Sequence, residues 1–314
     1  MTDWLLSAFG LLMLLMAGDS LVKGAVNLSL MLRVPAIIIS LTIVAFGTSA
    51  PELLIALNAT LSGASGIAVG NVVGSNTANV LLVLGIPALL TCLDTSKCDT
   101  NFTYFFMLFA SLVFIALSLT GGFGLWQGII LLALLLVYLL KNFKNAQDYK
   151  TASNDDTADL DLTKSFMPTW KICMFLVLGM IGLPLGADLL VDSASSIAQS
   201  FGISDAIIGL TLIAIGTSLP ELATTIVSAL RNQADVALGN VIGSNIFNLL
   251  GIIGVTALVE YVVIDPIFLK FDLWVMLGSS VILMPFILLK VKLTRVWGFV
   301  LTGLYLVYLN FLLI

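Results

Sequence analysis

The chain has 314 residues, of which 60% are hydrophobic and only 10% are charged, with a formal net charge of -5. Soluble globular domains carry about 25% charged residues, so this composition and a mean hydropathy of +1.13 exclude a soluble protein and indicate lipid as the solvent. The charge balance is not that of a nucleic-acid-binding protein. The sequence has no histidine, and its three cysteines form no C-x-x-C pair, which argues against a zinc or redox centre.

Ten segments are long and apolar enough to cross a bilayer, for which about 20 residues are needed. They are residues 4–30, 34–61, 66–91, 102–120, 123–141, 170–200, 203–230, 235–259, 272–290 and 294–313. The first segment is too long for the apolar region of a cleavable signal peptide, so we expect it to remain in the membrane. The sequence therefore predicts an all-α membrane protein with ten transmembrane helices.

A polar stretch over residues 142–169 separates the first five segments from the last five. It holds five aspartates and almost no large apolar side chains, as is typical of a flexible loop. We therefore expect a first five-helix repeat over residues 1–141, a linker over residues 142–169 and a second five-helix repeat over residues 170–314.

The basic residues orient this arrangement, because cytoplasmic loops are enriched in Lys and Arg. If both termini are extracytoplasmic, Lys270 is the one basic residue on the outer side. The remaining Lys and Arg residues then all fall on the cytoplasmic side: Lys23, Arg33, Lys97, Lys141, Lys144, Lys150, Lys164, Lys171, Arg231, Lys290, Lys292 and Arg295. The pattern predicts outer termini and a cytoplasmic linker.

The two halves repeat each other at a shift of 169 residues. Residues 44–52, VAFGTSAPE, fall on residues 213–221, IAIGTSLPE, and residues 70–79, GNVVGSNTAN, fall on GNVIGSNIFN in the second half. Because each half has an odd number of helices, the two copies would enter the membrane from opposite sides. This predicts an inverted-topology repeat, an architecture of transporters whose site lies near the bilayer midplane.

Glu52 and Glu221 occupy the repeated segments about one helical turn from the expected bilayer centre. A charged side chain at that depth costs at least about 2.5–3.5 kcal/mol, so the two carboxylates are expected to share a cation or to hold protons. The alternatives are duplication without chemistry, a proline kink and small-residue helix packing. None of these alternatives explains why a glutamate follows the proline in both copies.

The prolines beside these glutamates have no backbone N–H. We expect Pro51 and Pro220 to break their helices near the centre and to free carbonyl oxygens. A spacing of four residues puts Thr48 on the helix face of Glu52, and the third helix repeats this spacing with hydroxyl and amide residues. The resulting donors are all oxygens, which suit Ca²⁺ and Na⁺ rather than zinc or copper.

At these motifs the chain resembles the sodium/calcium exchanger branch of the Ca²⁺/cation antiporter superfamily, in its minimal prokaryotic form. That branch carries G-[ST]-S-x-P-[ED] on the second helix of each half and G-N-x-x-G-S-N-x-x-[ND] on the third. Both motifs occur here twice, within residues 34–91 and residues 203–259. The resemblance spans the whole chain, whereas the proton/calcium branch usually has Gly-Asn-Ala-x-Glu at the first motif.

The resemblance implies a set of ion ligands in which Glu52 and Glu221 are the central carboxylates. The other implied ligands are Thr48, Ser49, Thr217, Ser218, Ser75, Ser244, Asn79 and Asn248, with the backbone carbonyls of Ala45 and Ala214. Ca²⁺ and Na⁺ are then transported substrates, and no cofactor is expected.

The resemblance further implies a secondary active antiporter that exchanges Na⁺ for Ca²⁺ by alternating access, and not an enzyme. Potassium-dependent members have Asp where this chain has Asn248, so K⁺ should not be co-transported. The family's 3:1 exchange would make transport electrogenic. The expected partners are the two ions and the lipid bilayer, with no nucleic acid and no obligatory protein. The short linker favours a prokaryotic cytoplasmic (inner) membrane.

Two other functions stay open. A Ca²⁺/H⁺ antiporter could use the same glutamates, and a passive cation channel could use the same oxygens. An intramembrane enzyme is disfavoured because the sequence offers no nucleophile–base pair.

The long first and sixth segments are expected to lie outside the site and to slide as a gate. They carry Asp19 and Asp188, which we interpret as interfacial or water-facing residues rather than ion-entry residues. Lys23 is the expected partner of Asp19, four positions away.

Overall fold

The computed structural model describes residues 2–98, 100–155, 167–202 and 214–313, which are almost entirely helical. Eight helices among these residues are long and apolar enough to span a membrane. They coincide with eight of the ten expected segments. The seventh segment is described only from residue 214, because residues 203–213 lie outside the described residues, and the ninth is divided in two.

The first half contains α1 (Thr2–Leu32), α2 (Ala36–Ile39), the π-helical turn η1 (Ser40–Val44), α3 (Ala45–Leu61), α4 (Ser65–Ala78), the π-helical turn η2 (Asn79–Val83), α5 (Gly85–Leu90), the 3-10 turn η3 (Thr95–Lys97), α6 (Asn101–Ser118), β1 (Gly122–Phe123) and α7 (Leu125–Asp155). The second half contains α8 (Thr169–Ser200), α10 (Ala214–Gly216), α11 (Leu219–Leu230), α12 (Ala234–Ile246), the π-helical turn η5 (Phe247–Ile252), α13 (Ile253–Val259), β2 (Val262–Val263), α14 (Pro266–Lys270), α15 (Asp272–Ile282), α16 (Met284–Leu288) and α17 (Arg295–Leu313).

Two expectations about helix ends are wrong. α7 continues to Asp155, well into the stretch expected to be a loop, because residues 142–155 contain neither Pro nor Gly and nothing stops the helix at the membrane surface. The ninth segment is not one continuous helix. α15 ends at Ile282 and α16 begins at Met284, with Pro285 in its first turn, because proline cannot supply the N–H that a continuing helix needs.

The third segment of each half forms the centre of the molecule. The spans differ in the buried share of their most apolar 18-residue stretch. It is 83% for α4–η2–α5 and 89% for α12–η5–α13, but 22% for α8. The motif GNVxGSN lies on these two spans. Polar residues that a lipid-facing helix could not tolerate are thereby surrounded by protein.

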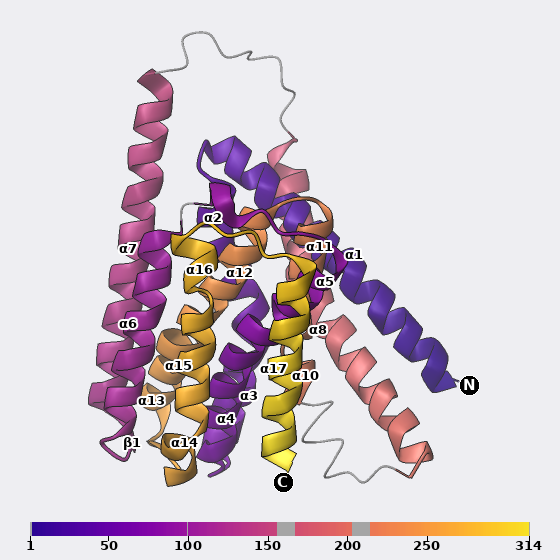
Figure 1. The fold of residues 1–314 in the computed structure, drawn as a ribbon, viewed down its shortest axis with the longest axis vertical. Coiled ribbons are helices and arrows are strands. Elements are labelled where there is room, and N and C mark those ends of the chain that lie inside the picture. The colour runs from indigo at the N-terminus through magenta and orange to yellow at the C-terminus, as the bar shows by residue number, and fades with distance from the viewer. Residues whose placement is uncertain (1, 99, 156–166, 203–213, 314) are drawn as a thin grey trace.

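α1 and α8 lie together on one flank of the bundle, with α6 and α7 on the opposite flank (Figure 1). Glycines hold α1 and α8 at close range: a Cβ on Gly10 would lie 2.8 Å from the backbone nitrogen of Leu190, and a Cβ on Gly179 would lie 2.6 Å from Cβ of Leu21. Small residues allow membrane helices this close approach. The pair is therefore packed backbone to backbone as a unit.

Short pairings join the two halves at both ends of the bundle. β1 pairs antiparallel with β2, with Gly122 opposite Val263. At the other end Leu93 and Leu293 exchange two backbone hydrogen bonds of 3.0 Å. Backbone hydrogen bonds therefore join the two halves at both ends of the bundle, whose centre is formed by α4–η2–α5 and α12–η5–α13.

Candidate functional site

The two proline motifs differ in local structure. α3 runs without interruption through Pro51, so the expected break in the first copy is wrong. Proline inside a tightly packed membrane helix can bend it and be accommodated by its neighbours. The second copy does break: α10 ends at Gly216, Thr217 and Ser218 form a turn, and α11 starts at Leu219 with Pro220 in its first turn.

π-helical turns shape the other motif in both halves. η2 begins at Asn79, and η5 contains Asn248, its equivalent at the shift of 169 residues. π-helical turns insert an extra residue into a helix and recur at functional sites. η2 packs on α11, which carries Glu221, and η5 packs on α3, which carries Glu52. Each asparagine is thus brought beside the helix that carries the other half's carboxylate.

Glu52 and Glu221 are completely enclosed, with 1% and 0% of their surfaces exposed. The charge of Glu221 acts on the Glu52 carboxylate, and Ser49 donates a hydrogen bond of 3.5 Å from Oγ to Oε1 of Glu221. Both oxygens of Glu52 and Oε2 of Glu221 accept no hydrogen bond from the described residues. No ion pair among the described residues involves either carboxylate.

Such an arrangement is costly without a cation, because two ionised carboxylates repel and each loses its hydration. Unpartnered oxygens in a water-excluded position are what a hard cation requires as ligands. The pair therefore has the chemistry of a cation site, and it lies between the two halves.

Most of the other residues expected at the site are also buried. Thr48 Oγ1 lies 3.3 Å from Ser244 Oγ and 3.3 Å from the Ala45 carbonyl oxygen. Further buried polar atoms have no partner among the described residues. They are Ser75 Oγ, Ser218 Oγ, Asn79 Oδ1, Asn248 Oδ1 and Asn248 Nδ2. Of the two expected residues not yet placed, Thr217 lies in the turn before α11 and Ala214 is the first residue of α10.

The expected residue set omits Asn76, Asn245 and Asn240, which are buried and hydrogen-bonded to one another or to residues of that set. Asn76 Nδ2 donates to the carbonyl oxygen of Asn245 at 3.2 Å, and Asn245 Nδ2 donates to that of Asn76 at 3.3 Å. Asn240 Oδ1 accepts from Thr48 at 3.3 Å, and its Nδ2 donates to the backbone carbonyl of Glu221. All three asparagines belong to the repeated motif GNVxGSN. Their recurrence at the shift of 169 residues could have identified them from the sequence.

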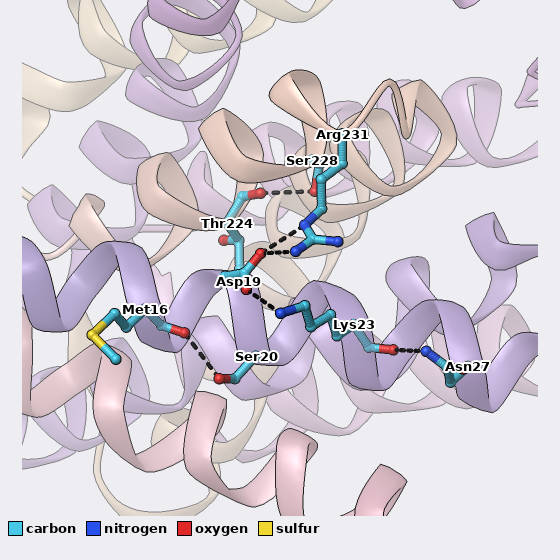
Figure 2. A network of polar contacts seen from close by, with 8 residues as sticks. All are labelled: Met16, Asp19, Ser20, Lys23, Asn27, Thr224, Ser228 and Arg231. Carbon is cyan, nitrogen blue, oxygen red and sulfur yellow. Dashed lines mark hydrogen bonds and ion pairs between the residues drawn. The ribbon is translucent and has the colours of Figure 1, made fainter. Parts of the chain in front are cut away.

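The surroundings of the pair differ on its two sides. On one side a cavity of about 330 Å³ is lined by Pro51, Thr217, Asp188 and Asp192, among others. On the other side α1 and α11 are tied through Asp19, as Figure 2 shows. Lys23 Nζ lies 2.7 Å from Asp19 Oδ2, as its spacing predicts, and Arg231 pairs with the same carboxylate.

The family model for the sodium/calcium exchanger protein matches residues 2–144 and 171–314. This chain belongs to the sodium/calcium exchanger family. The match covers both halves, including all four repeated motifs, and leaves out the segment between them.

Full-length relatives agree with this assignment. The sodium/calcium exchanger MaX1 of Methanosarcina acetivorans is 32% identical over 98% of this chain and 97% of its own length. The inner membrane protein YrbG of Escherichia coli (strain K12) is 37% identical over 87% of this chain and 85% of its own. Among solved structures, the sodium-calcium exchanger NCX_Mj superposes with a TM-score of 0.82 at 31% identity, over 98% of this chain and 97% of that one. The chain is thus a multi-pass integral membrane protein of an exchanger family.

Proposed function

We propose that the protein is a secondary active antiporter that exchanges Na⁺ for Ca²⁺ at a site centred on Glu52 and Glu221. One observation carries the proposal: two fully buried carboxylates, close enough for the charge of Glu221 to act on Glu52, have three of their four oxygens unpartnered among the described residues. Two ionised carboxylates neutralise one Ca²⁺. Na⁺ ions competing for the same oxygens would couple the two fluxes, because an empty site with two unpaired charges resists crossing the membrane.

The proposed ligand set adds hydroxyl, amide and carbonyl oxygens to the carboxylates. Thr48, Ser49, Ser75 and Asn79 come from the first half. Their equivalents in the second half are Thr217, Ser218, Ser244 and Asn248, and the carbonyls of Ala45 and Ala214 complete the set. The unpartnered atoms of four of these side chains support this assignment. Ca²⁺ takes about 6–8 oxygen ligands, which the set can supply.

We further propose that the halves, residues 1–141 and 170–314, are inverted five-helix repeats joined by a cytoplasmic segment over residues 142–169. The reciprocal bonds between Asn76 and Asn245, which are 169 residues apart, support a pseudo-two-fold axis. Their Nδ2 atoms also reach the sulfur atoms of Met276 and Met107, which differ by the same shift. Ten spans with outer termini then follow from the distribution of Lys and Arg. The inner-membrane name of one relative supports a prokaryotic cytoplasmic membrane.

In this orientation we assign the structure to an outward-facing state. The cavity lined by Asp188 and Asp192 then belongs to the outer side, and the ion pairs of Asp19, drawn in Figure 2, belong to the cytoplasmic side. α1 and α8 lie on the flank and pack as a unit (Figure 1), so their movement past the core would alternate access. That movement has to break the pair between Asp19 and Arg231.

Charge counting supports electrogenic and K⁺-independent exchange. With Asn at both positions 79 and 248, the carboxylates at the site centre are Glu52 and Glu221. Three Na⁺ in place of one Ca²⁺ would carry one extra positive charge per cycle, worth about 2.3 kcal/mol per 100 mV.

A Ca²⁺/H⁺ antiporter is the second candidate, because unpartnered buried carboxylates could instead bind protons. Purified protein in Na⁺-loaded liposomes separates the functions when ⁴⁵Ca²⁺ uptake is followed in K⁺-free buffer with a protonophore. Na⁺/Ca²⁺ exchange predicts uptake that disappears without the Na⁺ gradient. Uptake that ignores Na⁺ and needs a pH gradient, imposed in a parallel assay without the protonophore, would establish proton exchange, and net Ca²⁺ leak without a counter-ion would establish a channel.

A further inference from the structure

The orientation of one site amide is fixed by a chain of hydrogen bonds. Asn79 Nδ2 donates to Oδ1 of Asn245 at 3.1 Å, while Asn79 Oδ1 is buried and has no partner among the described residues. A side-chain amide can present either its oxygen or its NH₂ group in a given direction. Only the oxygen can bind a cation, so the direction of the Asn79 amide matters for binding.

Asn245 cannot reverse this arrangement by turning its own amide. Its Nδ2 donates to the backbone carbonyl of Asn76 at 3.3 Å and to the sulfur of Met107 at 3.7 Å. A carbonyl oxygen and a thioether sulfur accept hydrogen bonds and cannot donate them. Turning the Asn245 amide would place its oxygen against these two acceptors and its NH₂ group against that of Asn79.

The equivalent series of hydrogen bonds in the other half is incomplete. Asn76 Nδ2 donates to the carbonyl of Asn245 and approaches the sulfur of Met276 at 3.8 Å, as the shift of 169 residues predicts. Yet Asn76 Oδ1 and both amide atoms of Asn248 have no partner among the described residues. One of the two site amides is therefore held in a single orientation and its equivalent is not.

We propose that Asn245 is a positioning residue that holds the Asn79 amide with its oxygen toward the cation and thereby sets the affinity of the site for Ca²⁺. The inference rests on the proposed function, because it takes Asn79 as a ligand. Residues that orient a ligand typically change metal affinity by about 10- to 100-fold when they are replaced. Asn245 touches the ligand and not the ion, so its effect has to pass through Asn79.

The first test compares two matched substitutions, Asn245→Leu and Asn76→Leu, by the KM for Ca²⁺ in Na⁺-driven uptake into liposomes. Each removes one buried amide and one bond to the opposite backbone carbonyl. The orienting role predicts a rise in KM of about tenfold for Asn245→Leu and at most about twofold for Asn76→Leu. Equal changes in the two variants would mean that the asparagines only hold the helices together, and would overturn the inference.

The second test uses Asn79→Asp, whose carboxylate presents oxygen in either orientation. In that background Asn245→Leu should change the KM for Ca²⁺ by less than about twofold, even though Asn79→Asp itself alters the site. An undiminished tenfold effect would show that Asn245 does not act through Asn79. Wild-type protein without Na⁺-driven uptake would refute the proposed function, whereas active wild type with an unchanged KM in Asn245→Leu would refute this inference alone.

A milder pair of variants keeps the inference testable if Asn245→Leu does not fold. Met107→Leu removes the sulfur acceptor of Asn245, and Met276→Leu removes that of Asn76, with little change in side-chain volume. The expected result is a rise in KM of about twofold for Met107→Leu and none for Met276→Leu. Identical values in the two variants would contradict the proposed role.

Discussion

Arg231, which directly follows α11, donates from Nε to Oδ1 of Asp19 on α1 at 2.6 Å, across 212 positions of the sequence. Figure 2 shows Lys23 pairing with the other oxygen of the same carboxylate. The side chains of Asp19 and Arg231 are 32% and 40% exposed, and ion pairs in such positions stabilise by about 0–1 kcal/mol each. An ion pair of this strength can bias the equilibrium between outward-facing and inward-facing states and still break in each transport cycle.

Arg231→Gln should therefore shift the protein toward the inward-facing state. A loss of up to about 1 kcal/mol corresponds to a change of about fivefold or less in the ratio of the two states. The apparent KM for Ca²⁺ should fall at the cytoplasmic face and rise at the outer face. Initial rates in vesicles of the two orientations measure both values.

Lys292→Gln is the matched control for that variant. Lys292 pairs with Asp94 at 3.1 Å and is similarly accessible, but this pair does not join α1 to α11. It should leave the ratio of the two KM values unchanged. An equal shift in both variants would show that loss of a surface ion pair, rather than release of α1, causes the effect.

Gly243 on α12 should not tolerate a side chain. A Cβ there would lie 2.7 Å from Cβ of Ala45 and 2.8 Å from the carbonyl oxygen of Leu41, so α12 would have to move away from η1 and α3. Overpacking of this kind costs about 1–3 kcal/mol. We expect Gly243→Ala to lower the melting temperature and to raise the KM for Ca²⁺.

Gly278→Ala on α15 provides the comparison for the packing prediction. Apart from its chain neighbours and the backbone of its own helix, no atom of the described residues lies within 4 Å of a Cβ built at Gly278, so the melting temperature of Gly278→Ala should stay close to that of the wild type. If both alanine variants melt at the same temperature, the close contact between α12 and α3 is not what limits stability.

Asp94 should stabilise the protein in a pH-dependent manner. Hydrogen bonds from Ser96, followed by the bond from Lys292, lower the pKa of Asp94 from 3.8 to about 2. Because the folded pKa lies below the unfolded one, the stabilisation is full above pH 3.8 and is lost as the pH falls through about 2. The difference in melting temperature between wild type and Asp94→Asn should be constant from pH 5 to 8 and shrink below pH 3.8. A difference that grows on acidification would contradict this sign.

Transport should respond to membrane potential. If three Na⁺ leave as one Ca²⁺ enters, an inside-positive potential accelerates Ca²⁺ uptake by Na⁺-loaded liposomes and an inside-negative potential slows it. Initial uptake rates at imposed potentials of both signs measure the effect. Rates that are independent of potential would indicate electroneutral exchange.

The sequence predicts most of the bundle because its hydropathy and its internal repeat are both strong signals. The candidate site is proposed on the same signals: charged side chains at Glu52 and Glu221 are costly in a membrane, and the repeat shows which polar residues recur in both halves. Asn245 is not predicted as a positioning residue, because its role depends on which atoms its amide faces in the fold.

Several local features depend on tertiary packing and cannot be read from sequence pattern. The two prolines, Pro51 and Pro220, sit in near-identical motifs, yet one lies inside a continuous helix and the other begins a new one. The π-helical turns at Asn79 and Asn248 have no sequence signature. Arg231 is 212 positions from Asp19, so their pairing becomes visible only in three dimensions.

The central claim is that Glu52 and Glu221 together hold the transported Ca²⁺. Its most direct test is Na⁺-driven ⁴⁵Ca²⁺ uptake by Glu52→Gln and Glu221→Gln, assayed separately in liposomes alongside wild type and Lys292→Gln. Each glutamine keeps the side-chain shape but removes one charge from a site that needs two. Uptake should be lost in both glutamate variants and kept in Lys292→Gln. Na⁺-driven uptake at the wild-type rate in either folded glutamate variant would contradict it.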